Sequence, residues 1–550
     1  MSETAHAPPA DRTKSGEFKT SEGILYVSRP YRSKTSKKLR ALITFAPRKS
    51  HFDIGNELSG ANEFRGFFSL FWISTFILVL RVYVHGIETS GRPLDFGFAS
   101  MFSEDAIVLA ISDAVLVLST SLCVPFALAM KKRWFMYHWT GVIIQHLFQI
   151  IVLTIAITWT FNRKWPWVQS GFLTLHSLVM IMKMHSYMTV NGHLQMATIQ
   201  SEELFKELRQ ATDFVGGWDQ AISDAKSHKA ELDALTGMTS SSSNASTPIG
   251  TPEILEGSTT SYTDTATANA LRKRLMTISR ATGGNIAVVD IPDPGAVQQP
   301  SRTDDVQPEE PHPLVDHPNI MISEIARDYS ELRSELTSTG PNYVTWPNNI
   351  TLKNFAVYQL IPTLVYELEY PRTDRIRPIY VFEKTVATFG TFALLYTVTE
   401  TFILPYTPKL NQSILRSLLD LALPFMMAYL LLFFIIFECI CNAFAELSYF
   451  ADRQFYDDWY DHLPLRSGGL SRTWAMFLTF LLSACVHELV MIVVTQKFRF
   501  YLFMLQIVQI PMIIIGRIPM VKRNKLLGNI VFWLGLYAGF PLLCVAYVAY

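Results

Sequence analysis

Residues 476–494 read MFLTFLLSACVHELVMIVV, and this run decides the fold of the chain. It is long and apolar enough to cross a lipid bilayer as one α-helix. It nevertheless contains His487 and Glu488, an imidazole and a carboxylate side by side. Ionisable side chains cost roughly 3 kcal/mol or more in the hydrocarbon region, so a membrane helix that keeps such a pair is predicted to use it. We therefore expect a helical membrane protein with chemistry at His487.

The composition of the whole chain agrees with membrane insertion. Its 550 residues are 49% apolar and 17% charged, whereas a soluble protein carries about a quarter charged residues. The formal net charge is zero, which argues against nucleic-acid binding because that binding depends on a basic excess. The five cysteines lie in or beside apolar runs and read as small hydrophobic residues. The N-terminal stretch is polar, so we expect no cleavable signal peptide.

Nine apolar segments predict an all-α, polytopic fold with about nine transmembrane helices. The fourth segment is the most polar, because it contains His176, Lys183 and His185. Other polar residues inside the segments are typical of packing positions when taken singly, but together they predict a wet interior, an intramembrane reaction chamber. The segments lie near residues 67–84, 106–128, 139–160, 168–189, 385–404, 421–441, 475–495, 498–516 and 528–549. The other polar residues are Arg81, Asp113, Gln145, His146, Gln149, Glu400 and Glu438.

Basic residues predict the orientation, since cytoplasmic loops are enriched in Lys and Arg. They are abundant in the N-terminal tail and recur after the second and eighth segments, at residues 131–133 and 517–525. The loop after the first segment, residues 88–105, is acidic instead. We therefore expect a cytoplasmic N-terminus and a lumenal C-terminus.

The hydropathy pattern divides the chain into four parts. Residues 1–63 form a partly disordered cytoplasmic tail, and residues 64–195 hold the first four membrane segments. Residues 196–345 are a hydrophilic, largely disordered cytoplasmic insert, and residues 346–550 hold the other five segments. Within the insert, residues 196–235 read as an exposed helix. The Ser/Thr-rich residues 239–267 and the Pro/Asp-rich residues 288–315 are too polar to bury a core and are predicted to be disordered.

An aromatic and acidic cluster, residues 455–461 (FYDDWYD), lies before the histidine helix. On a helix its aromatic residues continue an apolar stripe that faces the membrane. Pattern alone therefore leaves two interpretations open, an interfacial anchor or part of a site. The stripe consists of Phe444, Leu447, Ala451, Phe455 and Trp459, opposed by Glu446, Asp452 and Asp457.

His487 also has two interpretations. Ser483 lies one helical turn before it, and a polar residue in a bundle is often satisfied by a neighbouring helix. The adjacent Glu488 favours the functional interpretation. Elsewhere the sequence contains no nucleotide-binding loop, no nucleophile elbow and no ligand spacing for a metal.

Two of these stretches together resemble the membrane-bound O-acyltransferase family. Residues 450–459 (FADRQFYDDW) resemble the FYxDWWN signature, and residues 483–489 (SACVHEL) resemble the helix of the catalytic histidine. Further segments are similar to the sterol O-acyltransferase branch, especially its fungal members. These are residues 362–366 (PTLVY), 370–372 (YPR) and 184–187 (MHSY) with Asn191-Gly192, together with Ala451 in the signature region.

The resemblance implies transfer of a fatty acyl group from acyl-CoA to the 3-hydroxyl of a sterol such as ergosterol, giving a storage ester. It also implies an endoplasmic reticulum membrane location in contact with membrane lipid, a homodimer or dimer of dimers, and no metal or cofactor beyond the acyl-CoA co-substrate. His487, buried and so biased toward its neutral form, would act as general base, a role worth about 10²–10⁴-fold in rate. Attack on the thioester would be direct, without an acyl-enzyme. The other implied site residues are Phe455, Tyr456, Asp458, Trp459 and Arg472 toward acyl-CoA, and Ser483 and Glu488 in support.

The chain departs from the family pattern in two places. Tyr460 and Asp461 replace the second tryptophan and the asparagine of the signature. In addition, Trp474 leads directly into Ala475, where the family has a catalytic asparagine and then an amphipathic segment. Either the chain is a degenerate member of the family or its gene model has lost an exon. We favour the lost exon because the flanks are otherwise intact, and we expect the chain as written to be impaired or inactive. Arg472 either pairs with a CoA phosphate or stabilises the start of its helix.

Two other functions fit the same residues. A diacylglycerol O-acyltransferase shares the signature and the histidine and also uses a lipid hydroxyl as acceptor. A non-catalytic sterol-binding or transport protein would use the intramembrane polar residues differently, although the segments lack the paired broken helices of many transporters.

Overall fold

The structure is a computed structural model that describes residues 17–20, 23–27, 43–45, 50, 65–93, 103–239, 312–338, 344–373, 375–407, 412–453, 472–516, 518 and 525–548. Seven of its helical segments are long and apolar enough to cross a membrane. Large apolar side chains such as Ile107, Phe382 and Leu534 remain exposed on them, as expected where a protein faces lipid. The predicted multi-pass helical fold is therefore confirmed. The seven segments are Ser69–Ser90, Ala106–Lys131, Tyr137–Arg163, Pro378–Tyr406, Ile414–Leu447, Met476–Thr495 and Leu526–Tyr547.

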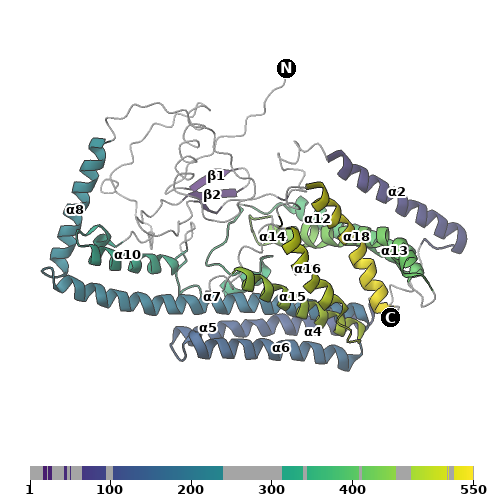
Figure 1. The fold of residues 1–550 in the computed structure, drawn as a ribbon, viewed down its shortest axis with the longest axis horizontal. Helices are drawn as coiled ribbons and strands as arrows, with labels where there is room; N and C mark the ends of the chain where they lie inside the picture. The colour runs from purple at the N-terminus through teal and green to yellow at the C-terminus, as the bar shows by residue number, and fades with distance from the viewer. Residues whose placement is uncertain are drawn as a thin grey trace, which may run out of the picture.

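A single long helix, α7 (Trp167–Asp213), runs through the middle of the fold (Figure 1). Its 47 residues extend about 70 Å at 1.5 Å per residue. The predicted fourth membrane segment lies in its first half. Polar side chains in this helix, including Gln169, Lys183 and Asn191, are buried against protein, so the helix tolerates a composition that lipid would not.

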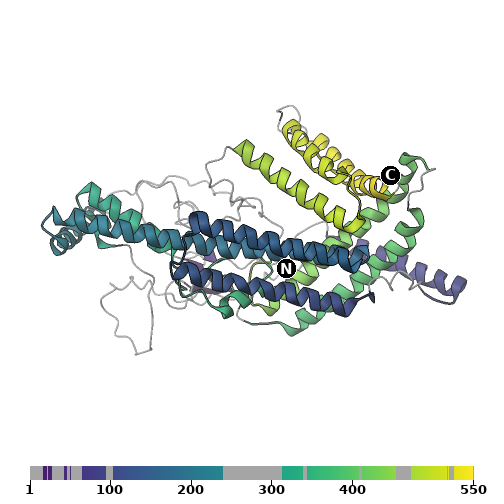
Figure 2. The ribbon, with the colours of Figure 1, turned by 90° about the horizontal axis from the view of Figure 1, so that it is seen from below.

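Five helical elements pack beside α7. They form a compact group along one side of that helix (Figures 1 and 2). The elements are α4 (Ala106–Ser119), η2 (Thr120–Leu122) and α5 (Cys123–Lys131), followed by the π-helix η3 (Tyr137–Gly141) and α6 (Val142–Arg163).

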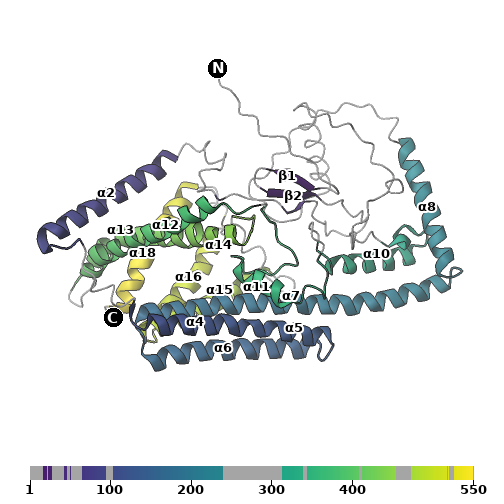
Figure 3. The same ribbon diagram turned by 180° about the vertical axis from the view of Figure 1, so that it is seen from behind.

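A second group of helices follows the insert. α12 packs against α13 and the π-helical η7, and α2 (Arg65–Ser90) lies at the edge of this group (Figure 3). The group consists of α12 (Pro378–Val398), η5 (Thr399–Ile403), η6 (Leu404–Tyr406), α13 (Ile414–Phe433), η7 (Phe434–Cys441) and α14 (Asn442–Leu447).

The last three helices form a third group, which lies beside α7 at an angle to its axis (Figure 2). α15 (Arg472–Thr495) contacts both α7 and α16 (Tyr501–Gly516), and α18 (Lys525–Val548) contacts α13. α16 is apolar but shorter than the seven segments above. Each of the nine predicted segments therefore coincides with a helix, although the fourth and eighth do not meet the length and apolarity of the others.

The second half of α7 carries a small helical module outside the membrane group (Figure 1). The helix over residues 196–213 ends, and the chain turns at Gly216 and Gly217, whose φ angles are +96° and +95°. α8 (Trp218–Thr239), η4 (Pro313–Asp316) and α10 (Ile320–Glu335) then pack onto α7 around a core of six buried side chains. These are Leu208, Ala221, Ala225, Leu314, Ile322 and Ala326.

Most of the predicted disorder falls on residues 240–311, which lie outside the described part of the chain. At its end, however, Leu314 is fully buried in the module core. The Pro/Asp-rich composition of residues 288–315 gave no indication that Leu314 packs in a core. The remaining helix, α11 (Leu352–Leu360), lies against α7 on the membrane side of the module (Figure 3).

Three short strands before the first membrane helix are an addition to the helical fold. β1 (Glu17–Thr20), β2 (Gly23–Val27) and β3 (Ile43–Phe45) form one antiparallel sheet in the order β1-β2-β3. They lie in the predicted N-terminal tail, so the membrane-spanning part keeps its all-α character.

Candidate functional site

The segments that resemble sterol O-acyltransferases are brought together in the fold. The backbone N–H of Tyr366 donates to Ser186 Oγ on α7 at 2.8 Å. Asn349 Nδ2 donates both to Asn191 Oδ1 and to the hydroxyl of Tyr366, each at 2.9 Å. Residues 184–192 and 362–366, far apart in sequence, thus form one interface.

Aromatic rings fill this interface. Tyr187 is fully buried and packs edge-to-face on Tyr366, with ring centroids 4.7 Å apart. Tyr358 lies against Tyr366 at 5.1 Å and stacks on Tyr370 at 6.4 Å. Burial raises the pKa of Tyr366 to about 12, so its hydroxyl stays protonated at physiological pH and can donate a hydrogen bond.

Lys183 fixes α11 to α7. Its Nζ donates to the carbonyl oxygens of Tyr358, Gln359 and Ile361, each at 2.9 Å. These carbonyls lie at the C-terminal end of α11, where helical partners run out and the helix dipole favours a cation. The positive charge of Lys183, which would be unfavourable in lipid, is therefore stabilised by the carbonyl oxygens at the end of α11.

A second close approach occurs at Gly192. A Cβ atom at this position would overlap the ring of Tyr137 in η3. The Tyr137 hydroxyl in turn lies within hydrogen-bond distance of Gln145 Oε1, at 3.1 Å, and of the Thr189 hydroxyl, at 3.0 Å. Glycine in the Asn191-Gly192 segment is thus required by packing between α7 and the π-helix.

Histidine and glutamine side chains line the contact between α6 and α7. Gln145 Nε2 lies 2.8 Å from His185 Nδ1, and His146 Nδ1 lies 3.1 Å from Gln149 Oε1. The rings of His146 and His185 are 5.7 Å apart. Toward the other end of α7, His176 pairs with Asp113 of α4. The intramembrane polar residues therefore mostly bridge neighbouring helices.

His487 lies on α15, and its recorded hydrogen bonds go to its own helix. Nδ1 is 2.7 Å from the carbonyl oxygen of Ser483 and 3.2 Å from its Oγ. Because a carbonyl oxygen only accepts, this arrangement assigns a proton to Nδ1, and in the neutral ring Nε2 then carries the lone pair. A neutral imidazole with Nε2 available is the form that a general base requires.

The imidazole of His487 is exposed in the described part of the chain, not buried as expected. The face of α15 that packs against other helices carries Ala484 and Glu488 instead. The preceding residues 454–471 lie outside the described part.

Glu488 points to a different place from His487. It is 3% exposed, and its carboxylate accepts from the backbone N–H groups of Phe500 and Phe503 at 2.8 and 3.1 Å. It also accepts from the Tyr547 hydroxyl at 2.9 Å. Glu488 therefore caps the N-terminus of α16 and ties α18 to it, as a carboxylate at a helix start is expected to do.

Phe455, Tyr456, Asp458 and Trp459 lie outside the described residues, and Arg472 is described only as the first residue of α15. Their proposed contact with acyl-CoA stays a prediction.

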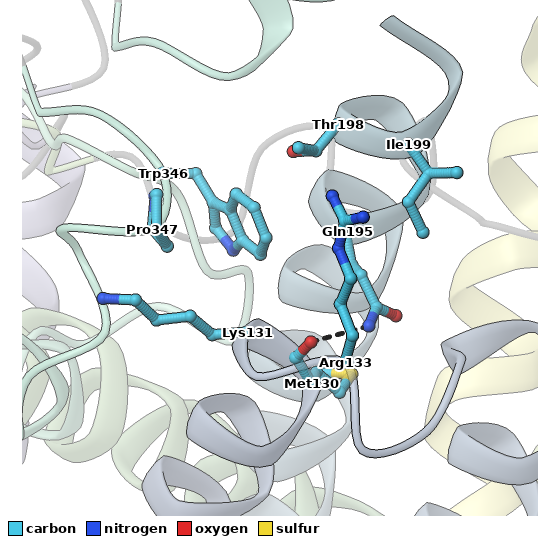
Figure 4. A pocket seen from close by; sticks show the side chains of 8 residues that line it. All are labelled: Met130, Lys131, Arg133, Gln195, Thr198, Ile199, Trp346 and Pro347. Atoms are coloured by element: carbon cyan, nitrogen blue, oxygen red, sulfur yellow. Dashed lines mark hydrogen bonds between the residues drawn. The ribbon is translucent and has the colours of Figure 1, made fainter. Parts of the chain in front are cut away.

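One cavity in the described part of the chain lies beside the second half of α7 (Figure 4). It measures about 180 Å³, and Gln195 at its wall donates to Met130 O at 2.7 Å. Its lining consists of Met130, Lys131, Arg133, Gln195, Thr198, Ile199, Trp346 and Pro347.

The position of α15 along α7 separates this cavity from His487. α15 meets α7 where a Cβ on Gly171 would lie 3.3 Å from Val494. Gln195 lies about 36 Å further along α7, whereas His487 lies about 10 Å from Val494, at 1.5 Å per residue. The cavity and the predicted base are therefore distinct places. Within the described residues, no three metal-ligating side chains gather into a group.

Sequence reasoning missed the partners of two buried carboxylates. Lys384 Nζ lies 2.6 Å from Glu438 Oε1, but the predicted fifth segment begins one residue after Lys384, so the pair was not considered. Arg377, which binds Glu446, precedes that segment. The signal was present as basic residues at the start of one membrane helix and acidic residues near the end of the next.

Comparison with known proteins places the chain in a family. Residues 460–549 match the family model of the membrane-bound O-acyltransferases. The chain is 30% identical over 552 aligned positions to sterol O-acyltransferase 2 of Candida albicans, covering 92% of this chain and 78% of that relative. It is 27% identical to probable sterol O-acyltransferase 1 of Schizosaccharomyces pombe, covering 92% and 86%. Diacylglycerol O-acyltransferase 1 of Dictyostelium discoideum matches at 28% over 38% of each chain. Given this similarity along nearly the whole chain and the geometry above, the protein belongs to the membrane-bound O-acyltransferase family.

Proposed function

We propose that this protein is an acyl-CoA-dependent sterol O-acyltransferase of the endoplasmic reticulum membrane. The observation that carries the proposal is the joining of residues 184–192 and 362–366, the segments typical of the sterol branch, into one buried interface. Similarity to sterol O-acyltransferases over 92% of the chain supports the same function.

In the proposed reaction His487 Nε2 accepts the proton of the sterol 3-hydroxyl as its oxygen attacks the acyl-CoA thioester carbon. The C–S bond then breaks, and the proton passes to the departing CoA thiolate. The products are a sterol ester and free CoA. The Nδ1 contact to the Ser483 carbonyl, at 2.7 Å, supports this role by holding the tautomer that leaves Nε2 unprotonated.

Phe455, Tyr456, Asp458, Trp459 and Arg472 would hold acyl-CoA at the cytoplasmic rim. No metal or further cofactor takes part in the proposed reaction, and we also propose a cytoplasmic N-terminus and assembly as a homodimer or dimer of dimers. Glu488 supports the site indirectly, because its contacts with Phe500 and Phe503 fix the helix that follows α15.

The junction between Trp474 and Ala475 should limit activity. The alignment with the Candida relative runs over 552 positions but uses 92% of the 550 residues, so the relative has residues with no counterpart here. We propose that part of this difference is the segment expected before the histidine helix, and that restoring it restores full activity.

A diacylglycerol acceptor is the main alternative. The Dictyostelium diacylglycerol O-acyltransferase supports it, but that similarity covers 38% of this chain. The sterol relatives also match the regions that hold residues 184–192 and 362–366, so a sterol acceptor is favoured.

The test is expression in a yeast strain that lacks its own sterol and diacylglycerol acyltransferases, with the chain as written and with the missing segment restored from a relative. Lipid extracts should contain sterol ester and no added triacylglycerol, with more ester from the restored chain. His487→Ala in the restored chain should abolish ester formation, whereas Cys485→Ala, two residues away and also exposed, should retain it. Triacylglycerol as the main product would show that the acceptor is diacylglycerol and not a sterol. Ester formation that persists in His487→Ala would show that His487 is not the general base.

A further inference from the structure

The cavity beside the second half of α7 lies where two membrane segments meet. One of its lining residues, Lys131, ends the segment Ala106–Lys131, and the next segment begins at Tyr137. Two tryptophans lie between Lys131 and the first turn of that next segment, Trp134 and Trp139, and they are 74% and 72% exposed. Tryptophan side chains concentrate at the level of the lipid headgroups. The cavity therefore lies at headgroup depth.

Gln195 holds the wall of the cavity in a fixed shape. It is 1% exposed, and its Oε1 accepts from the backbone N–H of Tyr137 at 3.0 Å. Its Nε2 donates to the carbonyl oxygens of Met130 and Phe135 at 2.7 and 3.1 Å. These three bonds tie the turn to α7, so the space of about 180 Å³ is preformed. It far exceeds the roughly 10–15 Å³ that one water molecule requires.

One hydrogen-bond donor in the lining lacks an acceptor. Trp346 Nε1 is buried and has no partner among the described residues, although the backbone N–H of Trp346 donates to the carbonyl of Leu336 at 2.8 Å. An indole N–H can only donate, and leaving a buried donor unpaired is costly. In Figure 4 the nitrogen lies on the edge of the indole ring that faces Lys131. A ligand with an acceptor oxygen at this edge of the cavity would satisfy the donor.

The charged side chains in the lining are both basic. They are Lys131 and Arg133. Arg133 Nη2 pairs with Glu202 Oε1 at 2.5 Å, and the two side chains are 52% and 47% exposed. Lys131 is exposed and forms no hydrogen bond or salt bridge with another described residue, and its neighbour Lys132 places its ammonium 5.3 Å from the Trp134 ring centroid. Three cations and one carboxylate therefore leave an excess of two positive charges beside the cavity.

The surrounding elements do not reverse this excess. The chain around Trp346, residues 344–360, carries one charged side chain, and it is a lysine. The next charged residues along α7 sum to zero, as do those at the end of α10. A net positive cavity at the membrane surface favours an anionic ligand. The residues counted on the two helices are Glu203 with Lys206 and Arg333 with Glu335.

We propose that this cavity binds the phosphate of an anionic phospholipid headgroup. Lys131 neutralises the phosphate, and Trp346 Nε1 donates to one of its oxygens. Exposed apolar side chains on the adjoining membrane helices, such as Leu128 and Ile143, provide a surface for the acyl chains, which favours a lipid over free phosphate. Because the cavity lies apart from His487, the lipid is a bound ligand and not the acceptor of the proposed reaction.

The experiment is a titration of the full chain with dioleoyl phosphatidate, in detergent, observed by native mass spectrometry. Dioleoyl phosphatidylcholine, whose headgroup has no net charge, is the comparison lipid. Phosphatidate should bind at least about fivefold more tightly than phosphatidylcholine, and inorganic phosphate should displace it no better than chloride at equal ionic strength. Equal affinity for the two lipids would overturn the proposal. Displacement by phosphate but not by chloride would show that the ligand is a free phosphate instead of a lipid.

Two adjacent lysines separate a built site from general attraction to the basic turn. Lys131→Gln removes the cation of the lining and should weaken phosphatidate binding by about fivefold or more. Lys132→Gln is the matched control, since it makes the same change at an exposed lysine outside the lining, and should stay within about twofold. Unchanged binding in Lys131→Gln, or equal weakening by both variants, would contradict the proposal.

Trp346→Phe tests the unpaired donor. It keeps an aromatic ring but loses the N–H, so phosphatidate binding should weaken by about threefold or more. Trp139→Phe, at an exposed tryptophan outside the lining, should stay within about twofold. Without lipid, Trp346→Phe should unfold at the wild-type temperature or slightly above it, because the donor that it removes has no partner in the protein. Unchanged phosphatidate affinity in Trp346→Phe would exclude the indole N–H as a ligand donor.

Discussion

The helices around α7 and the helices that carry His487 are held together in different ways. α7 is fixed by polar side chains buried within the protein, where Lys183, Asn191 and Gln195 reach segments far away in sequence. In the group of α15, α16 and α18, the polar contacts of the described residues centre on the single carboxylate of Glu488. Buried polar residues therefore join helices in both regions, through several separate side chains around α7 and mainly through Glu488 in the α15 group.

The difference also bears on the junction at Ala475. The hydrogen bonds of Lys183, Asn191 and Gln195 on α7 go to residues that lie outside α15. The junction itself lies inside α15, near the start of that helix. We therefore expect the chain as written to fold around α7 even where its activity is impaired.

The largest effect is expected from Lys183→Met in the α7 scaffold. The change leaves the carbonyls of Tyr358, Gln359 and Ile361 without their common donor, which should cost about 3 kcal/mol or more. Thermal unfolding of the purified protein in detergent measures it. Lys353→Met, on the exposed side of α11, is the control and should stay within about 0.5 kcal/mol. Similar losses from both changes would show that Lys183 is not a special anchor.

Gly192→Ala should have the next largest effect. The added methyl group overlaps the Tyr137 ring, and such overpacking typically costs about 1–3 kcal/mol. The matched change Gly390→Ala in α12 meets no atom within 4 Å and should be neutral or slightly stabilising. If the two variants unfold at the same temperature, the close approach of α7 and η3 is contradicted.

Glu488→Gln tests the α15 group. It removes the negative charge at the start of α16, which should cost about 1 kcal/mol. Hydrogen exchange should accelerate at the amides of Phe500 and Phe503, whereas amides in α7 should keep their protection. Faster exchange throughout α7 would mean that the two regions are coupled more tightly than their contacts indicate.

The smallest effect is expected from pH in the module on the second half of α7. Burial lowers the pKa of His312, whose ring lies 5.4 Å from that of Trp218. Since the folded state favours the neutral ring, its contribution is complete above the ordinary pKa of about 6.5 and is lost as the pH falls toward the lowered value. The protection of the α10 amides, corrected for the slower intrinsic exchange at lower pH, should therefore fall modestly between pH 7.5 and pH 5.5, and His312→Asn should flatten that dependence. A dependence of the same size in the variant would exclude His312 as its source.

The sequence predicted the membrane helices well because hydropathy over about 20 residues is a local property. It did not predict the length of α7, since the polar residues 190–213 continue the helix only by packing on α10 and the neighbouring segments. It also placed Lys183 and His185 as unfavourable membrane residues, because their partners lie in other parts of the chain. Pairs such as Lys384 and Glu438 depend on which helices become neighbours, and that information is not local.

For the candidate site, the sequence predicted that Ser483 lies one turn from His487, and the two are in contact because this depends on helical spacing alone. It grouped Glu488 with them because adjacent letters suggest a shared role. Neighbours on a helix point about 100° apart, and in the fold Glu488 turns to α16. Adjacency in sequence was a weaker guide than spacing.

The unbroken run of α7 has an evolutionary consequence. One extra residue between Asn191 and Leu208 would raise the outer module by about 1.5 Å and swing it by about 100°, turning the Leu208 side chain out of its core. Insertions and deletions among related proteins should therefore be rare along this rod and frequent beyond α8. Positions where chain length varies among related proteins should therefore lie outside the segments whose packing depends on helical register.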